Sequence, residues 1–485
     1  MKSICPLLML LWSLVVGLGC RSEPAASSPR NMVLVVVDTL RSDHLSAYGY
    51  DRETAPVISW LAAEGVRWNG VSPTSWTKPA VASILTGLHP LRHQAFGASE
   101  PLSPGVTTLA ERLAAQGYHS LGIVANGWLS RKAGFARGFT NYFSMSEDLG
   151  YGPFSTGEEV NAEVFSRLAG LQPPFFLYVH YLDPHAPYEP SRDYEGRPLR
   201  GRLSERKEVG ILELRMSEVL NRPAALLEDA RDLYDGEIRQ TDLALGRLLR
   251  ELDRRGLTGG TLTVVTSDHG EEFQDHGRMG HGQSLYEEVV RVPLVFHAPG
   301  AVTAGLRGGT ASLMDILPTA LEILGFEPPK GLDGSSLVAA MKAPAPSIKE
   351  RSLLLHLDLD AGSKPNLQGG QALGLRDDDS KLILAGDPRA KMYFDLRSDP
   401  NERSSRFGEP GLEPILGPRA RALADIYNGF AGRAFPRSAE RLEQQEALGA
   451  LGYLGVPAKG GDRRIPPHIL PADLRPQGSL GWSVR

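Results

Sequence analysis

Short hydrophobic runs recur along the chain, and several of them end in an acidic residue. The first, NMVLVVVD at residues 31–38, is unbroken, rich in β-branched side chains, and closes on Asp38. An unbroken run of this kind is typical of a strand that is buried on both faces of a parallel sheet. Further strands are predicted at residues 119–126, 175–183, 260–270 and 291–300.

The segments between these runs carry helical periodicity. The clearest helical face has the spacing i, i+4, i+7 and consists of Tyr234, Ile238, Thr241, Leu245, Leu248, Leu249 and Leu252. Alternating strands and helices predict an α/β fold with a mostly parallel sheet. The 485 residues are enough for one large domain and a smaller one.

Toward the C-terminus the pattern changes to short runs joined by polar turns. Antiparallel strands are predicted within residues 350–360, 372–386 and 391–402. We therefore expect a large domain over residues 31–345 and a small antiparallel subdomain over residues 346–435. Residues 436–485 combine a short helix with a polar end rich in proline and glycine, which we expect to be poorly ordered.

Residues 1–20, MKSICPLLMLLWSLVVGLGC, combine one lysine with an apolar run that is too short for a stable membrane span. They are predicted to be a secretory signal, and the closing GLGC resembles the lipidation box of bacterial lipoproteins, with Cys20 as the acylated residue. An ordinary cleaved signal is the alternative. Residues 21–30 then form a flexible tether, and we expect an exported lipoprotein of the bacterial cell envelope, attached to a membrane through Cys20.

Composition narrows the chemistry. The chain has two cysteines, Cys5 and Cys20, and both lie in the predicted signal. The remainder therefore has no cysteine for a disulfide, a metal site or nucleophilic catalysis. Hydrophobic residues make up 41% and charged residues 22%, as in an ordinary globular protein. The net charge of -5 provides no basic surface, so nucleic acid is not an expected partner.

Three of the predicted strands end in aspartate, at Asp38, Asp183 and Asp268. The histidines close to them are His185 in DPHAPY, His269 in SDHG and His281 in GHG. Because ligands of open α/β sheets bind at the carboxyl ends of strands, we expect a metal site here. Mixed carboxylate and imidazole ligands favour Zn²⁺ or Mn²⁺ over Ca²⁺ or Mg²⁺, which prefer oxygen ligands.

Five separated motifs resemble, in order, those of the sulfatase family within the alkaline phosphatase superfamily. They are VVVDTLRSDHLSAYGY, SWTKPAVASILTGLHP, HYLDPHAPYEP, VVTSDHGEEFQDHG and YEEVVRVPLVFHAPG. The segment KMYFDLRSDPNE resembles the end of the family's C-terminal subdomain, so the likeness covers residues 31–405. It implies an alkaline-phosphatase-like central mixed sheet flanked by helices, with a small C-terminal subdomain that carries an antiparallel sheet.

The resemblance also implies roles for single residues. The matching positions are Asp38, Asp268 and His269 for metal binding, Thr77 for the nucleophile, His185 for the histidine of the family's PH motif, and His281 for the region of a lysine or histidine that contacts the anion. Arg41 matches the arginine that follows the first acidic motif, and its role stays open.

The nucleophile motif departs from that of typical sulfatases. Those enzymes carry cysteine or serine in the pattern C/S-x-P-S-R, and this residue is converted to formylglycine. The corresponding residues here are Thr77, Lys78, Pro79, Ala80 and Val81. Oxidation of a threonine, a secondary alcohol, would give a ketone instead of the required aldehyde. The paired aspartates after the first strand are also reduced to Asp38 and Thr39, so formylglycine chemistry is not expected.

These departures favour chemistry at phosphorus. The pattern T-x-P…S-I-L-T-G resembles the nucleophile segment of nucleotide pyrophosphatase/phosphodiesterases, and the predicted metal ligands with Thr77 resemble the single-metal site of lipoteichoic acid synthases and lipid A phosphoethanolamine transferases. All of these imply attack by a threonine alkoxide. A Zn²⁺ or Mn²⁺ ion at Thr77 would lower the pKa of the hydroxyl and neutralise charge on the phosphoryl oxygens. Asp183, with His185 or His281, would hold a second ion or the non-bridging oxygens.

Two positions have simpler alternatives. Thr77 suits the N-cap of the following helix, a role compatible with attack at a helix start, where the dipole favours anions. Lys78 either contacts the substrate anion or is solvated.

Three functions follow. The favoured one is a metal-dependent hydrolase or transferase that acts on phosphate or phosphonate esters or phosphodiesters through a covalent Thr77 intermediate. The second is a sulfuric ester hydrolase. The third is a catalytically silent lipoprotein that binds an anionic glycan or lipid, although Asp38, Asp268 and His269 have no purpose in a silent site. The substrate is expected to be an anionic ester, whether a small molecule, a glycan or a lipid head group.

Overall fold

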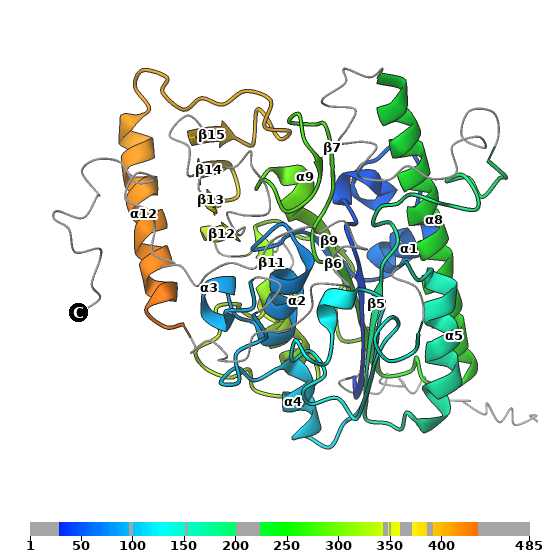
Figure 1. The fold of residues 1–485 in the computed structure, drawn as a ribbon. Helices are drawn as coiled ribbons and strands as arrows, with labels where there is room; N and C mark the ends of the chain where they lie inside the picture. Colours follow the sequence, from blue (N-terminus) through cyan, green and yellow to red (C-terminus); the bar gives the residue numbers. More distant parts are fainter. Residues whose placement is uncertain are drawn as a thin grey trace, which may run out of the picture.

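The computed structural model describes residues 29–96, 100–150, 154–199, 224–342, 348, 351–358, 371–385 and 391–434. The predicted signal, most of the tether and the predicted tail lie outside these residues. Figure 1 shows a large α/β domain beside a small sheet covered by one long helix.

A mixed nine-stranded sheet forms the centre of the large domain, in the order β10-β2-β9-β6-β1-β5-β3-β4, with β11 also paired to β2. Its strands are β1 (Asn31–Val37), β2 (Val66–Val71), β3 (His119–Val124), β4 (Asn141–Ser144), β5 (Phe175–Tyr181), β6 (Thr261–Ser267), β9 (Arg291–His297), β10 (Gly305–Leu306) and β11 (Ala311–Ser312). Strand β9 runs antiparallel to both of its neighbours, and the other pairs are parallel. The strands predicted from the hydrophobic runs are confirmed.

Both faces of this sheet are buried, and successive side chains along each strand enter opposite cores. In β1, Met32, Leu34 and Val36 enter one core, whereas Val33, Val35 and Val37 enter the other. Figure 1 shows α2 and α4 on one side of the sheet and α1, α5 and α8 on the other. This two-sided burial explains the unbroken hydrophobic runs.

Among the described residues, the α-helices of the large domain are α1 (Pro56–Glu64), α2 (Thr77–Thr86), α3 (Pro90–His93), α4 (Leu109–Ala114), α5 (Gly157–Arg167), α8 (Ala224–Arg254), α9 (Glu287–Val290), α10 (Ile316–Ile323) and α11 (Val338–Lys342). The predicted helical face lies in α8, where Tyr234, Ile238, Leu245 and Leu252 are buried. Within the part of the chain that the structure describes, no helix is long and apolar enough to cross a membrane.

The small sheet contains β12 (Leu353–Asp358), β13 (Gln371–Arg376), β14 (Ser380–Ala385) and β15 (Lys391–Asp395), paired antiparallel in sequence order. One face packs on α12 (Glu413–Ala431) through residues such as Leu375 and Leu423. The other packs on the large domain, where Leu355 and Phe394 join a core that contains Trp76. The mixed sheet with flanking helices and the separate antiparallel sheet confirm the predicted fold class.

Buried charges also join the two units. Lys381 of the small sheet is fully buried, and its Nζ lies 2.9 Å from Glu287 and 3.0 Å from Glu402. Arg376 reaches Glu287 at 3.1 Å. Because an unpaired buried charge is costly, this network favours one docked arrangement of the small sheet against α9.

Buried histidines lie at the same junction. His89 stacks on Phe430 of α12 with ring centroids 4.5 Å apart. His93 Nδ1 accepts from the Ala95 N–H, so its Nε2 donates to Ser83 Oγ at 3.1 Å. Burial lowers the pKa of His93 to about 3 and holds that of His89 well below its ordinary value. Both rings are therefore neutral in the folded protein near neutral pH.

Acid is consequently expected to destabilise the fold. Unfolded histidines take up protons below pH ~6.5, whereas these two resist protonation while folded, so their stabilisation is present above that pH and is lost as the pH falls. Between pH ~6.5 and ~5 the loss should be about 2 kcal/mol of unfolding free energy per histidine. Urea unfolding at several pH values should show a weaker pH dependence in His93→Gln. The exposed His119→Gln serves as control, and an unchanged slope in His93→Gln would contradict the assignment.

Candidate active site

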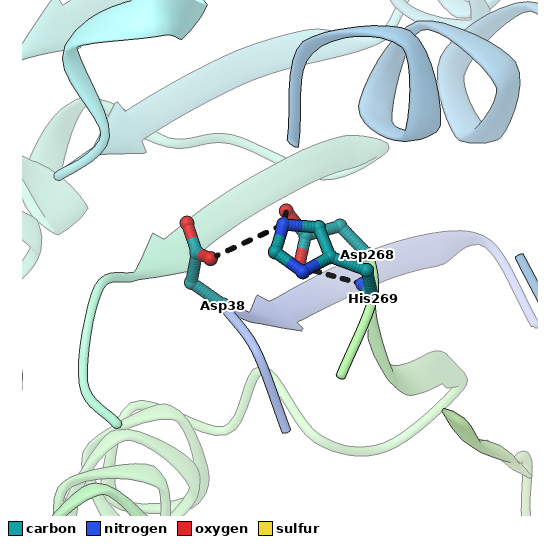
Figure 2. Close-up of side chains that lie close together, drawn as sticks. All are labelled: Asp38, Asp268 and His269. Carbon is teal, nitrogen blue, oxygen red and sulfur yellow. Dashed lines mark hydrogen bonds and ion pairs between the residues drawn. The ribbon is translucent and has the colours of Figure 1, made fainter. Parts of the chain in front are cut away.

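The carboxyl ends of adjacent strands bring the predicted metal ligands together. Asp38 is the first residue after β1, and Asp268 is the first after β6. These strands are parallel neighbours with Val37 opposite Ser267, so the two aspartates follow in register. His269 comes next along the chain, and Figure 2 shows its imidazole and the Asp268 carboxylate close together, facing the carboxylate of Asp38.

The three side chains offer ligand atoms that all lie within 4.8 Å of one another. His269 Nε2 is 3.8 Å from Asp38 Oδ1 and 3.5 Å from Asp268 Oδ2. Its Nδ1 donates to the carbonyl of Gly270 at 2.9 Å, which leaves the lone pair on Nε2. Neutral imidazole with its second nitrogen held by an acceptor is the usual state of a metal-bound histidine.

The hydrogen bonds of the two aspartates test whether a cation fits this group. Asp38 Oδ2 accepts from Asn126 and His180, and Asp268 Oδ1 accepts from the backbone N–H groups of Thr39 and His269. The other oxygens, Asp38 Oδ1 and Asp268 Oδ2, are buried without a hydrogen-bond partner. Buried polar atoms are nearly always paired, so the two bare oxygens facing an imidazole lone pair fit a divalent cation.

Electrostatics point the same way. All three groups are fully buried. Burial, together with the charge of Asp268, raises the pKa of Asp38 well above its ordinary value. A bound cation would reverse this effect, because it favours the ionised form of both carboxylates.

Thr77 contacts this group. Its Oγ1 lies 3.2 Å from His269 Nε2 and 3.3 Å from Asn126 Nδ2. Thr77 is the first residue of α2, and the N-cap position belongs to Trp76. The alternative that Thr77 acts only as an N-cap is therefore wrong, since its hydroxyl is directed at the candidate metal ligands.

Two residues of the site were missed in the sequence. Asn126 follows β3 and donates to Asp38 at 2.7 Å, while its Oδ1 accepts from the Trp128 backbone. His180 lies within β5, accepts from Tyr178 and donates to Asp38 at 3.2 Å. Burial lowers its pKa to about 4. Asn126 ends a predicted strand, and this position at a strand end could have indicated a site residue. His180 lies inside a predicted strand, so its position in the sequence gave no such indication.

His185 and His281 lie beside the candidate metal ligands. The His281 ring centroid is 4.4 Å from that of His269 and 5.0 Å from that of His185. His185 donates from Nδ1 to the Ala186 carbonyl at 2.7 Å, and burial lowers its pKa to about 4. The structure thus places both predicted histidines at the site.

Asp183 does not join the group. The residue opposite Asp38 in the β1–β5 register is Leu182, so Asp183 is one position further and its side chain faces the helices. Its carboxylate accepts from the Gly157 N–H at 3.3 Å and from Gln240, and burial raises its pKa to about 6. Its predicted role as a metal ligand therefore has no support in this arrangement.

Two cationic residues were left with open roles. Lys78 is fully buried, so the alternative that it is solvated is wrong, and burial lowers its pKa to about 7. Arg41 forms ion pairs with Asp43 at 2.7 Å and Asp275 at 2.9 Å. Arg41 thereby fixes the segment after β6, whereas contact of Lys78 with substrate stays a prediction.

Known proteins share sequence and fold with this chain. The family model described as Sulfatase matches residues 30–326. The chain is 27% identical to the multifunctional alkaline phosphatase superfamily protein PehA of Trinickia caryophylli, over 80% of this chain and 93% of that protein. It is 26% identical to an ulvan-active sulfatase of Formosa agariphila, over 79% and 78%. The crystal structure of the phosphonate monoester hydrolase of Agrobacterium radiobacter superposes with a TM-score of 0.65 and 21% identity, over 83% and 96%, which shows the same fold.

Proposed function

This chain belongs to the sulfatase family, and on that premise we propose that it cleaves phosphate or phosphonate esters, or phosphodiesters, through a covalent intermediate on Thr77. The family makes the protein an ester hydrolase with a candidate metal site. The observation that carries the finer proposal is the position of Thr77 Oγ1, 3.2 Å from His269 Nε2 at a buried group of two carboxylates and an imidazole.

The side chain at this position supports chemistry at phosphorus over chemistry at sulfur. A threonine cannot yield the formylglycine aldehyde, so a sulfated Thr77 would lack the hydrate that expels sulfate. A phosphorylated threonine needs no such route, because water attacks phosphorus directly. The hydroxyl of Thr77 therefore supports phosphoryl transfer.

The residues of the site divide the first step between them. A divalent ion held by Asp38, Asp268 and His269, with Zn²⁺ or Mn²⁺ favoured by this donor set, would supply the positive charge that makes a hydroxyl nucleophilic and offsets charge on phosphoryl oxygens. Thr77 Oγ1 loses its proton to solvent and forms a bond to phosphorus, while the bond between phosphorus and the ester oxygen breaks and the departing alkoxide takes a proton from solvent. Asn126, held by Asp38 and Trp128, directs its amide N–H toward Thr77 Oγ1 and is placed to stabilise the negative charge of the nucleophile.

Hydrolysis of sulfuric esters is the second candidate. It is favoured by the likeness to the ulvan-active sulfatase, whereas the relative from Trinickia caryophylli is described as multifunctional. A protein of this family with a hydroxyl nucleophile could therefore accept more than one anionic ester.

A substrate comparison tests the proposal. The purified protein, loaded with Zn²⁺ or Mn²⁺, is assayed with the 4-nitrophenyl esters of phosphate, phenylphosphonate and sulfate and with the bis-4-nitrophenyl phosphodiester. We expect kcat/KM for at least one phosphorus ester to exceed that for the sulfate by about 100-fold, equivalent to about 2.7 kcal/mol of transition-state stabilisation. The same assays with Thr77→Ala give the background. Turnover of the sulfate alone would exclude the phosphoryl mechanism.

A further inference from the structure

The end of the central sheet opposite the candidate active site is the end at which its parallel strands begin. Asn31 of β1 lies opposite Thr261, the first residue of β6. Strand β9 is antiparallel, and its last residue, His297, lies opposite Thr263 of β6. Strands β2, β3, β5 and β10 also begin at this level. We call this end the amino end, and the end that carries the candidate metal ligands the carboxyl end.

The loops at the amino end are poor in charge. Four of them contain no aspartate, glutamate, lysine or arginine, namely residues 115–118, 168–174, 256–260 and 298–304. Arg167 and Arg255 border two of these loops, and each is paired with a glutamate four residues earlier. Arg30 and Glu64 are exposed at the same end. Removal of water from a charged side chain is costly, so these loops approach a less polar surface with little loss.

Two large apolar side chains are exposed at the amino end. Trp60 of α1 is 51% exposed and Leu306 of β10 is 56% exposed, the highest values among the large hydrophobic residues that the structure describes. The ring of Trp60 lies 5.3 Å from that of His297. The N–H of Gly305, beside Leu306, donates to the carbonyl of Gly65 directly after α1. Both side chains therefore lie at one corner of the amino end, and tryptophan is a residue type that suits the boundary between lipid and water.

The predicted lipid anchor joins the protein at the same end. Arg30 directly precedes β1, and the predicted acylation site, Cys20, lies ten residues earlier in the chain. Ten residues span at most about 35 Å when fully extended. Leu306 in β10 is four strand spacings from β1, which at about 4.8 Å per strand is about 19 Å. The predicted tether therefore keeps this corner of the amino end within reach of the membrane.

The tether alone does not determine which end of the sheet faces the membrane. Eight residues lead from Arg30 to Asp38, or about 26 Å along a strand, so the tether is also long enough to bring the carboxyl end to the bilayer. That end is rich in charge. The segment after β6, with strands β7 (Glu272–Phe273) and β8 (Met279–Gly280), holds two aspartates, two glutamates and one arginine within residues 268–278. The cost of removing water from these charges favours the amino end as the lipid-facing one.

We propose that the amino end of the sheet rests on a lipid bilayer, with Trp60 and Leu306 in the headgroup region. This inference rests on the predicted anchor at Cys20, and its consequence for the substrate rests on the proposed function. The bilayer then lies about 26 Å from Asp38, so Thr77 and the candidate metal ligands face the aqueous phase. The substrate is accordingly a soluble ester or a glycan, and not a head group of the membrane that holds the enzyme.

Single-cysteine labels measure which end faces the lipid. The cysteines of the chain are Cys5, in the predicted signal, and Cys20, so the acylated protein has no free thiol. Ala63→Cys, at the exposed end of α1, and Asn401→Cys, beside Arg41 at the carboxyl end, are each labelled with bimane. The acylated proteins are placed in vesicles of phosphatidylethanolamine and phosphatidylglycerol with nitroxide-labelled head groups. We expect most of the fluorescence to be quenched at position 63 and little at position 401.

Two double variants test the apolar side chains themselves. In the protein labelled at position 63, Trp60→Ser together with Leu306→Ser should reduce quenching to the level of the carboxyl-end label, because the contact with lipid is lost. Phe407→Ser together with Ile415→Ser is the matched control. It also removes two exposed apolar side chains, but from the small subdomain, and should leave quenching at position 63 unchanged.

Equal quenching of the two labels, or stronger quenching at position 401, would overturn the inference. Protection of position 63 from aqueous iodide without quenching by lipid would also overturn it, and would identify a protein partner such as a second copy of the chain. So would mass spectrometry that finds no acyl group on Cys20, because the tether is what commits this end to a membrane.

Turnover of a soluble 4-nitrophenyl ester separates the inference from the proposed function. The rate should be equal in vesicles and in detergent, since the active site faces water in both. A rate that falls only in vesicles would contradict the assigned orientation. Absence of turnover in both would contradict the proposed function instead, while the quenching of the two labels would still report the orientation.

Discussion

Thr77→Ala is expected to lower kcat by on the order of 10⁴-fold or more, because removal of a nucleophile usually leaves only binding and charge stabilisation. The hydroxyl lies 3.2 Å from His269 Nε2 and 3.3 Å from Asn126 Nδ2, and alanine would leave this position without an oxygen. Steady-state kinetics with a phosphorus ester measure the effect. Mass spectrometry of denatured, acid-quenched enzyme should show a phosphoryl adduct in the wild type and none in this variant.

Thr77→Ser provides the matched control. It keeps the hydroxyl and removes one methyl group, so kcat should stay within about tenfold of the wild type. Both variants should retain bound metal, because Asp38, Asp268 and His269 are unchanged. An unaltered rate in Thr77→Ala would exclude Thr77 as the nucleophile and would leave the metal site without its proposed partner.

Asp268→Ala is expected to remove the metal and activity together. Asp268 contributes one of two bare buried oxygens, so elemental analysis should find metal near background, and kcat should fall by roughly 10³-fold or more. With metal present at about 1,000 times its dissociation constant, the wild type should gain about 4 kcal/mol of unfolding free energy that the variant lacks.

The metal-free proteins should differ less. Removing Asp268 leaves the buried N–H groups of Thr39 and His269 without their acceptor, which destabilises the fold, but it also relieves the repulsion that raises the pKa of Asp38. The difference in melting temperature between the wild type and the variant should therefore be larger with metal than without it, whereas a purely structural aspartate would give the same difference in both forms. Asp183→Asn is the control that should keep its metal, because Asp183 contacts Gly157 and Gln240. Metal content unchanged in Asp268→Ala would contradict the site.

Much of the fold follows from local patterns. The run at 31–38 became β1 with both faces buried, and the periodic segment around Tyr234 became part of α8. Such patterns can be recognised in the sequence because the positions that become buried repeat at a fixed spacing within one strand or helix. The pairing of Asp38 with Asp268 was also predictable, since each directly follows a parallel strand.

The limits of prediction lie in register and in burial by distant segments. Asp183 follows a strand like the other two aspartates, yet the β1–β5 register places Leu182 opposite Asp38 and turns Asp183 toward α5 and α8. His180 reaches Asp38 from within a strand. These differences depend on how segments more than a hundred residues apart align, which no local pattern contains.

By itself the sequence determined the elements, the residue types available for chemistry and the hydroxyl in place of a cysteine or serine at the nucleophile position. These are properties of short segments, whose composition and spacing act locally. Only the tertiary structure decided which side chains meet. Strand register brought Asn126 and His180 to Asp38 and kept Asp183 away, and packing buried Lys78 and placed His281 beside His269. The reason is geometric, because the direction of a side chain depends on the partners of its strand or hairpin, and those partners are distant in sequence.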